Sequence, residues 1–413
     1  MKSLLLLIML MSGIQANEWD FTGKTTTILS NYETNDIVKG KNSEQIYAQT
    51  LQLNIDYNNG NFHFQATPFA YKYGTNSNEP IKYRNWAEPF DSYDVWFRSL
   101  YATYTVGNWS IGAGVLPFSN SSPTKFNDDY IEDGEGVLLI NDSVLTSVFV
   151  VHRYGNSKTI FGAGTPYHLI VNTGNYIDPT LREDAYSIFL INTYKIEKWE
   201  IISEYLYNDI RYNQKQLAED HLIGATISWD DSENSGLSLY GTAAGCFWDG
   251  KQSDSKDEIY NTYFSDNDYG LPASYYGEIV KSKYPDNFAL EDQKSYGAAH
   301  MLGVRQDFDI GTKEFFINAE WMRTYGNYIS GNQGTFYLGK NNQFYNIRDN
   351  SYYIQVGWIV NENLRFRLSH EMIEMKREGK IGNPGLTVPV EQSLRDEKIN
   401  RINVTNLIMT YKF

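Results

Sequence analysis

Residues 401–413 read RINVTNLIMTYKF and end on an aromatic residue. Counting back by twos separates an apolar face from one that is largely polar, with Ile408 as the exception. Such a period of two residues is typical of a β-strand with one buried or lipid-facing side. Because no later segment of this sequence covers it, we expect its apolar face to meet either lipid or a core formed by earlier strands. The apolar face carries Leu407, Met409, Tyr411 and Phe413, and the polar face carries Asn406, Thr410 and Lys412.

The same alternation recurs along the chain. In residues 44–57, Leu51, Leu53 and Ile55 alternate with polar residues, and the sequence NNGN at 58–61 predicts a tight turn before the pattern resumes. We therefore predict a hairpin here. Comparable windows predict strands at residues 19–31, 44–57, 62–73, 93–106, 109–118, 144–153, 158–170, 184–195, 199–208, 220–230, 236–248, 294–308, 313–326, 350–360, 364–374 and 399–413.

The predicted links between these strands are of two kinds. Short links such as Gly107-Asn108 and Gly155-Asn156 follow every even-numbered strand, and long polar links follow every odd-numbered one. This segregation is typical of transmembrane barrels, which have short periplasmic turns at one rim and long extracellular loops at the other. An even number of strands lets the last strand pair with the first and leaves no exposed edge. The sequence predicts an all-β, transmembrane antiparallel barrel of about 16 strands, with about 18 as the alternative.

Composition bears on compartment and partners. Residues 1–16 carry Lys2, an apolar block and small residues up to Ala16, which predicts a cleavable signal peptide and leaves residues 17–413 for the barrel. The formal net charge of −15 argues against nucleic acid as a partner. The 33 Tyr, 21 Phe and 9 Trp fit a thin wall with aromatic rims and water inside. Cys246 is the only cysteine, so no intrachain disulfide can form.

The export signal, the strands with short and long links in turn, and a terminal strand ending in Tyr411-Lys412-Phe413 resemble a bacterial outer-membrane porin over residues 17–413. The Asn- and Tyr-rich, Pro-poor composition resembles the porin-like proteins of epsilonproteobacteria. The resemblance implies a location in the bacterial outer membrane, contact with its lipids and lipopolysaccharide, and assembly as a homotrimer. It also implies that Tyr411 and Phe413 form the signal that the outer-membrane assembly machinery recognises.

The third long link, residues 119–143, is the candidate for a constriction, because a barrel of this width encloses water unless a loop enters it. In sixteen-stranded porins the third long loop folds into the lumen, and the resemblance implies the same role here. The apolar residues 137–140 would pack such a loop against the inner wall. An exposed acidic loop and a calcium site at its carboxylates are the alternatives. The acidic residues of the predicted constriction are Asp128, Asp129, Glu132, Asp133 and Glu135.

Basic residues on the barrel wall would face this acidic loop. Arg365 and Arg367 alternate with the apolar residues of segment 364–368, so we expect both to point into the lumen. Arg305 and Arg98 are further candidates, although the two faces of the strand around Arg98 are both mixed. The alternative for each arginine is a position at the lipopolysaccharide rim, where it would also bind anions.

These features predict a porin-like channel for passive diffusion of small hydrophilic solutes and ions, with a mild cation preference because acidic residues dominate. The alternatives are a substrate-specific channel and a structural or adhesive barrel that uses the long loop at residues 249–293. The six His include no HExxH spacing and no nucleophile motif, so we expect no enzymatic activity. We also expect no cofactor, apart from the calcium alternative above.

Overall fold

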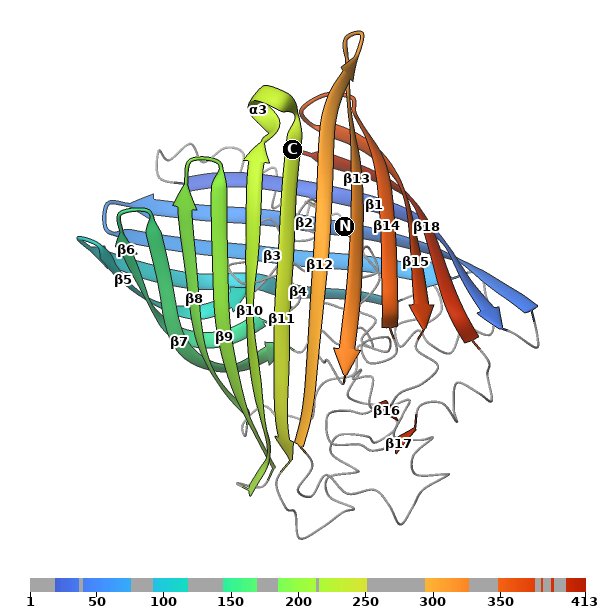
Figure 1. Cartoon of the computed structure of the whole chain (residues 1–413). Helices are drawn as coiled ribbons and strands as arrows, with labels where there is room; N and C mark the ends of the chain where they lie inside the picture. The colour runs from blue at the N-terminus through green and yellow to red at the C-terminus, as the bar shows by residue number, and fades with distance from the viewer. Residues whose placement is uncertain are drawn as a thin grey trace.

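Sixteen antiparallel strands close into one barrel in the computed structural model (Figure 1), which confirms the predicted fold. The structure describes residues 19–36, 40–75, 92–117, 144–168, 185–212, 215–250, 294–326, 348–375, 380–381, 388–389 and 399–413. The strands of the barrel are β1 (Trp19–Asp36), β2 (Gly40–Asn59), β3 (Phe62–Thr75), β4 (Ser92–Val106), β5 (Trp109–Pro117), β6 (Val144–Tyr154), β7 (Ser157–His168), β8 (Ala185–Ile196), β9 (Trp199–Tyr212), β10 (Lys215–Asp231), β11 (Leu237–Gly250), β12 (Lys294–Ile310), β13 (Lys313–Gly326), β14 (Arg348–Ile359), β15 (Leu364–Met375) and β18 (Ile399–Lys412).

The terminal strand β18 closes the barrel by pairing with β1 on one side and β15 on the other. The pairing with β1 begins at Lys24 and Lys412. Phe413 extends it, since its N–H donates to the Gly23 carbonyl at 2.8 Å and its own carbonyl accepts from the Gly23 N–H at 2.9 Å. The Phe413 ring covers Gly23, where an added Cβ would lie 2.5 Å from a ring carbon. Backbone pairing therefore holds the first and last strands of the barrel together, and so does the Phe413 ring, which only a glycine at position 23 accommodates.

Exposure alternates along β18 with a period of two residues. Leu407 is 50% exposed and Phe413 is 46% exposed, whereas Val404 and Ile408 are 0% exposed. The side chains that alternate with the exposed apolar ones point to the inside of the closed barrel. The apolar face of the terminal strand therefore forms part of the outer surface, and Ile408, the exception in the sequence pattern, lies on the inner wall.

The short links form tight turns at the rim that carries the β12–β13 turn (Figure 1). Four two-residue turns begin with a glycine at positive φ, namely Gly60, Gly107, Gly155 and Gly311, with φ between 54° and 67°. Glu197 takes the same position in the β8–β9 turn, with a φ of 51°. Glycine adopts such a φ without a steric penalty, and hairpin turns that match the twist of the strands require it. Three of these turns read Gly-Asn and the fourth reads Gly-Thr, so the glycine is the feature that they share.

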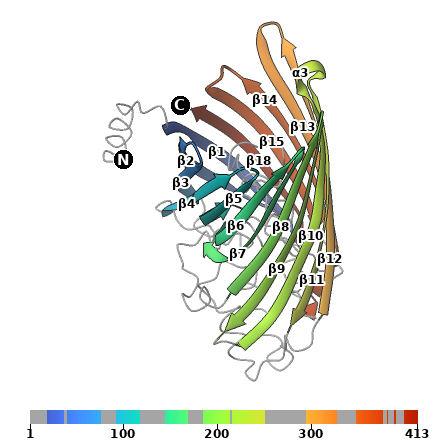
Figure 2. The same cartoon turned by 90° about the vertical axis from the view of Figure 1, so that its left-hand side faces the viewer.

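The link between β10 and β11 contains a one-turn helix, α3 (Ser232–Ser235), at the same end of the wall as the β12–β13 turn (Figure 2). Asp231, at the edge of the wall, accepts hydrogen bonds from Lys198 and from the side chains of Asn234 and Ser235. The hydrogen bond from Lys198 is the largest cause that lowers the pKa of the Asp231 carboxyl to about 2. Asp231 therefore ties the β8–β9 turn to this link.

Two links that the pattern predicts to be long are short, because the strands beside them extend further. Only residues 37–39 separate β1 from β2, and only residues 213–214 separate β9 from β10. The added strand residues are mostly polar on both faces, as suits strands that project beyond the lipid into water, so alternation alone does not reveal them. A small separate sheet pairs β16 (Lys380–Ile381) with β17 (Val388–Pro389).

Several predicted segments lie outside the described residues. They are the signal peptide at residues 1–16, the acidic loop at residues 119–143 and all of the loop at residues 249–293 except its first two positions.

Aromatic side chains gather on the outer face near the short turns. Trp109 is 55% exposed, Trp199 is 49% exposed and Phe62 is 40% exposed. Trp19 and Tyr57, on β1 and β2, add a ring pair with centroids 4.6 Å apart. An aromatic band of this kind marks the level of a membrane–water interface. Within the described segments, no helix is long and apolar enough to cross a membrane.

Candidate functional site

Four basic side chains gather on the inner face of three neighbouring strands. Arg365 and Arg367 come from β15, Lys412 from β18 and Lys24 from β1. Lys24 and Lys412 are direct partners in the β1–β18 pairing. Arg365 is paired with Thr410 of β18, and the guanidinium of Arg367 donates a hydrogen bond to the hydroxyl of Thr410. These four residues form a basic cluster in the half of the barrel nearer the short turns.

The basic cluster contains two of the predicted wall residues, Arg365 and Arg367, and two residues that were not predicted. Arg367 is 2% exposed and shares the inner face with Arg365, as alternation predicts. Lys24 is 3% exposed, and it was not among the predicted wall residues. The two-residue count puts Lys412 on the polar face of its strand, but only the pairing of the first and last strands brings both lysines beside the arginines. The four positive charges, two of them on directly paired residues, make this part of the inner wall locally basic.

Arg305 of β12 also lies on the inner face, but a carboxylate neutralises it. Its Nη2 lies 2.8 Å from Oδ1 of Asp307, and its Nε donates to the same oxygen at 2.9 Å. The guanidinium carbon lies 4.2 Å from the centroid of the Phe316 ring. Arg305 is therefore held in place by an ion pair and by a cation–π contact.

Two carboxylates lie on the same wall toward the long links. Glu320 of β13 and Glu371 of β15 are paired with Tyr353 of β14 from its two sides. Glu320 is 5% exposed and Glu371 is 1% exposed, and the Ser351 hydroxyl donates to Oε1 of Glu371 at 2.7 Å. Along β15, Glu371 stands about 13 Å from Arg367, at the usual rise per strand residue. The inner wall therefore carries carboxylates on its long-link side and the basic cluster on its short-turn side.

Glycines on the inner face let large rings lie flat against the wall. A Cβ added to Gly357 would lie 2.1 Å from the Phe316 ring, and one added to Gly303 would lie 2.0 Å from the Tyr240 ring. In both cases the ring comes from the neighbouring strand. Rings that lie along a wall occupy less of the enclosed space than rings that project across it, so these glycines keep the lumen wide.

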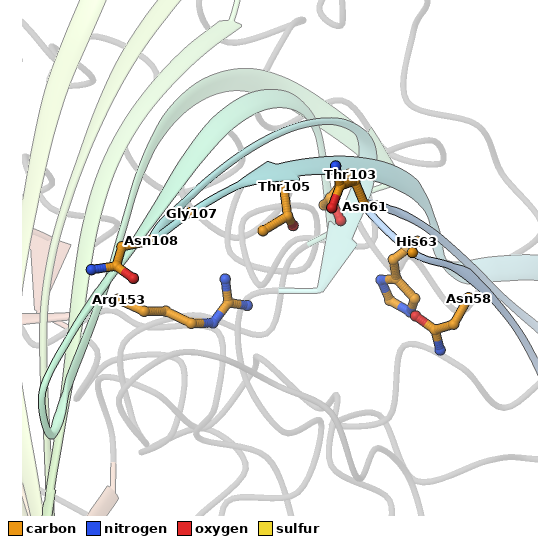
Figure 3. Close-up of a pocket in the computed structure, with 9 residues that line it drawn as sticks. Asn58, Asn61, His63, Thr103, Thr105, Gly107, Asn108 and Arg153 are labelled. Carbon is orange, nitrogen blue, oxygen red and sulfur yellow. The ribbon is translucent and has the colours of Figure 1, made fainter.

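A polar hollow of about 450 Å³ opens on the inner side of the barrel at the turns of β2 to β6 (Figure 3). Arg153 lies on one side of it and His63 on the other. Arg153 Nη1 donates to the Ser110 hydroxyl at 3.0 Å, and His63 Nε2 lies 3.4 Å from Oδ1 of Asp56. Its amides and hydroxyls can bind water or a hydrophilic solute. The hollow is lined by Asn58, Gly60, Asn61, His63, Thr103, Thr105, Gly107, Asn108 and Arg153.

Arg98 lies at a β-bulge in β4. The bulge falls between the pairs Thr67–Ser99 and Pro68–Phe97. The extra residue shifts the two-residue phase of the strand, which explains why both faces look mixed in the sequence.

The remaining predicted site residues divide between the outer face and the undescribed part of the chain. Tyr411 and Phe413 are 42% and 46% exposed on the outer face. The acidic residues between Asp128 and Glu135, with the calcium alternative that rests on them, lie outside the described residues. In the part of the chain that the structure describes, no group of three or more His, Cys, Asp or Glu could hold a metal ion.

The comparison with solved structures finds the same fold in outer-membrane proteins. OprB of Pseudomonas putida matches with a TM-score of 0.52 and 10% identity, over 96% of this chain and 94% of that one. The anion-selective porin of Comamonas acidovorans matches with a TM-score of 0.51 and 9% identity, over 96% and 100% of the two chains. The trimer form of OmpT of Vibrio cholerae matches with a TM-score of 0.50 and 10% identity, over 96% and 99%. No family model and no curated protein matches the sequence.

These likenesses extend over almost the whole chain and define its class. The protein is a closed, sixteen-stranded antiparallel β-barrel with the fold of outer-membrane porins. At identities of 9% and 10% the likeness concerns the fold. The resemblance to porin-like proteins of epsilonproteobacteria stays a prediction.

Proposed function

We propose that the protein is an outer-membrane channel through which small hydrophilic solutes and ions diffuse passively. The observation that supports this most is a closed barrel of sixteen strands with exposed apolar residues outside and an inner face on which polar and charged residues are mixed with apolar ones. A barrel with this number of strands is too wide for its side chains to fill. In the proposed orientation, the short turns, the start of β1 and the end of β18 face the periplasm. The long links face the exterior.

The constriction and the assembly belong to the same proposal. An acidic loop at residues 119–143 that enters the lumen would face the basic cluster and create a local field across the pore. The barrel is proposed to form a homotrimer, as the trimer form of OmpT does. Tyr411 and Phe413, exposed at the end of β18, are proposed to be the residues that the assembly machinery reads.

Charge selectivity has two opposing contributions. The net charge of −15 attracts cations to the mouth of the pore, which supports a mild cation preference. The basic cluster acts in the opposite direction at the wall. We propose that the basic cluster moderates a cation preference set by the rest of the chain.

Swelling of liposomes that contain the purified full-length protein tests passive diffusion. Neutral sugars of increasing size should enter at rates that fall smoothly with size, because a water-filled pore sieves by diameter. Swelling with a single solute would favour the substrate-specific alternative. Folded protein that gives no more swelling than empty liposomes would contradict the channel and favour a structural or adhesive barrel.

A further inference from the structure

The polar hollow at the turns of β2 to β6 is lined by one permanent charge and otherwise by amides, hydroxyls, glycines and one histidine. Arg153 carries that charge, and no carboxylate is among the lining residues. Asp56 contacts His63 but does not line the hollow. The volume of about 450 Å³ lies within the range of about 300–1,000 Å³ in which proteins hold small ligands. The lining therefore suits a small solute with one negative charge.

Arg153 is held so that one edge of its guanidinium stays available. Its Nη1 donates to the Ser110 hydroxyl at 3.0 Å, and Ser110 Oγ lies 2.8 Å from Oγ1 of Thr105. Ser110 is 3% exposed, so this anchor is built into the wall. Within the described residues, no carboxylate pairs with Arg153. The guanidinium points into the hollow (Figure 3), and its remaining edge, formed by Nε and Nη2, can donate two parallel hydrogen bonds to a carboxylate.

Charges beside the hollow give it a polarity. Lys158 is the direct partner of Arg153 in the β6–β7 pairing, so its side chain leaves the same face of the wall. On the opposite side, His63 contacts Asp56, which is itself paired with Asp20 of β1. The electrostatic potential therefore falls from the Arg153 side toward the His63 side, and an anion in the hollow is oriented with its charge at Arg153.

The other polar groups of the hollow suit hydroxyl groups rather than a second charge. Amides and hydroxyls can both donate and accept hydrogen bonds, as the hydroxyls of a sugar do. Arg153 of β6 and His63 of β3 stand three strand spacings apart, about 14 Å between their backbones, so a solute of several carbon atoms can reach from one side to the other. The uncharged groups are the amides of Asn58, Asn61 and Asn108 and the hydroxyls of Thr103 and Thr105.

We propose that the hollow is a binding site for a hydroxylated carboxylate, a sugar acid of the gluconate type. Arg153 binds the carboxylate, and the amides and hydroxyls toward His63 bind the hydroxyl groups. The inference rests on the proposed function, because the solute reaches the hollow through the lumen. It adds a saturable site to the diffusion path, at the mouth that the proposed orientation places in the periplasm.

Isothermal titration calorimetry of the purified full-length protein in mild detergent tests this site with gluconate, acetate and glucose. Gluconate should bind more tightly than acetate, which lacks the hydroxyls, and more tightly than glucose, which lacks the charge. Arg153→Gln should weaken gluconate binding about tenfold or more, as expected for loss of a charged hydrogen-bonding group. Ser110→Ala should weaken it less, because the charge remains and only its anchor is lost.

Two further variants separate the site from general effects of charge. Lys195→Gln removes a positive charge at the same rim, where Glu200 neutralises it at 2.8 Å, and should bind gluconate like the original protein. Asn61→Asp places a negative charge in the hollow with almost no change in size. It should weaken the binding of gluconate and leave the binding of glucose unchanged. Heat-dependent mobility on gels checks that each variant is folded.

Three results would overturn the proposal. They are an absence of gluconate binding, unchanged gluconate affinity in folded Arg153→Gln, and sulfate binding as tight as that of gluconate, which would leave a general anion site only. Conductance separates this site from the channel. A protein that gives current steps but binds no gluconate loses this site alone, whereas one that binds gluconate but gives no current loses the proposed function and keeps the site.

Discussion

Glu197 holds a backbone conformation that suits glycine. Four other short turns have glycine at the equivalent position, and Glu197 has a φ of 51°. A left-handed φ costs an L-residue about 1–2 kcal/mol, and glycine loses about 0.5–1 kcal/mol more backbone entropy on folding. We expect Glu197→Gly to raise the free energy of unfolding by about 0.5–1 kcal/mol in urea titrations of the folded barrel. Gly155→Ala, the matched change in the opposite direction, should lower it. A less stable Glu197→Gly variant would show that this turn is not strained.

The basic cluster predicts a defined change in selectivity. Replacing Arg365 and Arg367 together with glutamine removes two positive charges from the inner wall. The ratio of cation to anion permeability should rise by about twofold or more, because fixed charge controls the local concentration of counterions. The zero-current potential in a KCl gradient measures this ratio. Lys313→Gln, which removes a positive charge that lies 5.3 Å from the outer-face ring of Trp358, is the control and should change little. An unchanged potential in the double variant would exclude these arginines from the ion path.

At the scale of elements, the seam between β18 and β1 is the pairing that closes the barrel. Deleting Phe413 or replacing Gly23 with alanine should reduce the yield of folded barrel, because both changes disturb the ring that covers Gly23. Gly241→Ala is the matched control, since its added Cβ would lie 3.3 Å from Leu302 rather than 2.5 Å from a ring. The heat-modifiable fraction after refolding into vesicles measures the yield.

The molecules that do fold without Phe413 should conduct normally, because Phe413 lies on the outer face. A normal yield of folded barrel without Phe413 would show that Phe413 is needed neither for the β1–β18 seam nor for recognition by the assembly machinery.

The strands themselves were predictable because lipid outside and water inside impose a strict period of two residues. Arg365 and Arg367 were placed on the correct face by that period alone. Prediction failed where the period is interrupted or has no lipid to enforce it. The bulge at Arg98 shifts the phase, and the extensions of β1, β2, β9 and β10 into water are polar on both faces. Alternation in the sequence therefore predicts the part of a strand that faces lipid better than it predicts the full length of the strand.

At the scale of the whole molecule, the link lengths predicted the strand number and the closure, but not the groups that form across strands. The basic cluster joins Lys24 to Lys412, nearly the whole chain apart, and Glu320 and Glu371 meet on either side of β14. The register between strands creates both groups, and register depends on turn geometry and closure rather than on any local pattern. A sequence of this kind therefore predicts the face of the barrel on which a residue lies, but not its neighbours on the adjacent strands.

The central claim is that this barrel encloses a continuous water-filled path. Current through a planar bilayer after addition of the purified full-length protein tests it most directly. We predict discrete current steps of uniform size that are ohmic and scale with the conductivity of the salt solution, as a water-filled pore requires. Protein that is folded and inserted, as judged by heat-modifiable mobility and protection from protease, but that gives no current steps at any salt concentration would contradict the account.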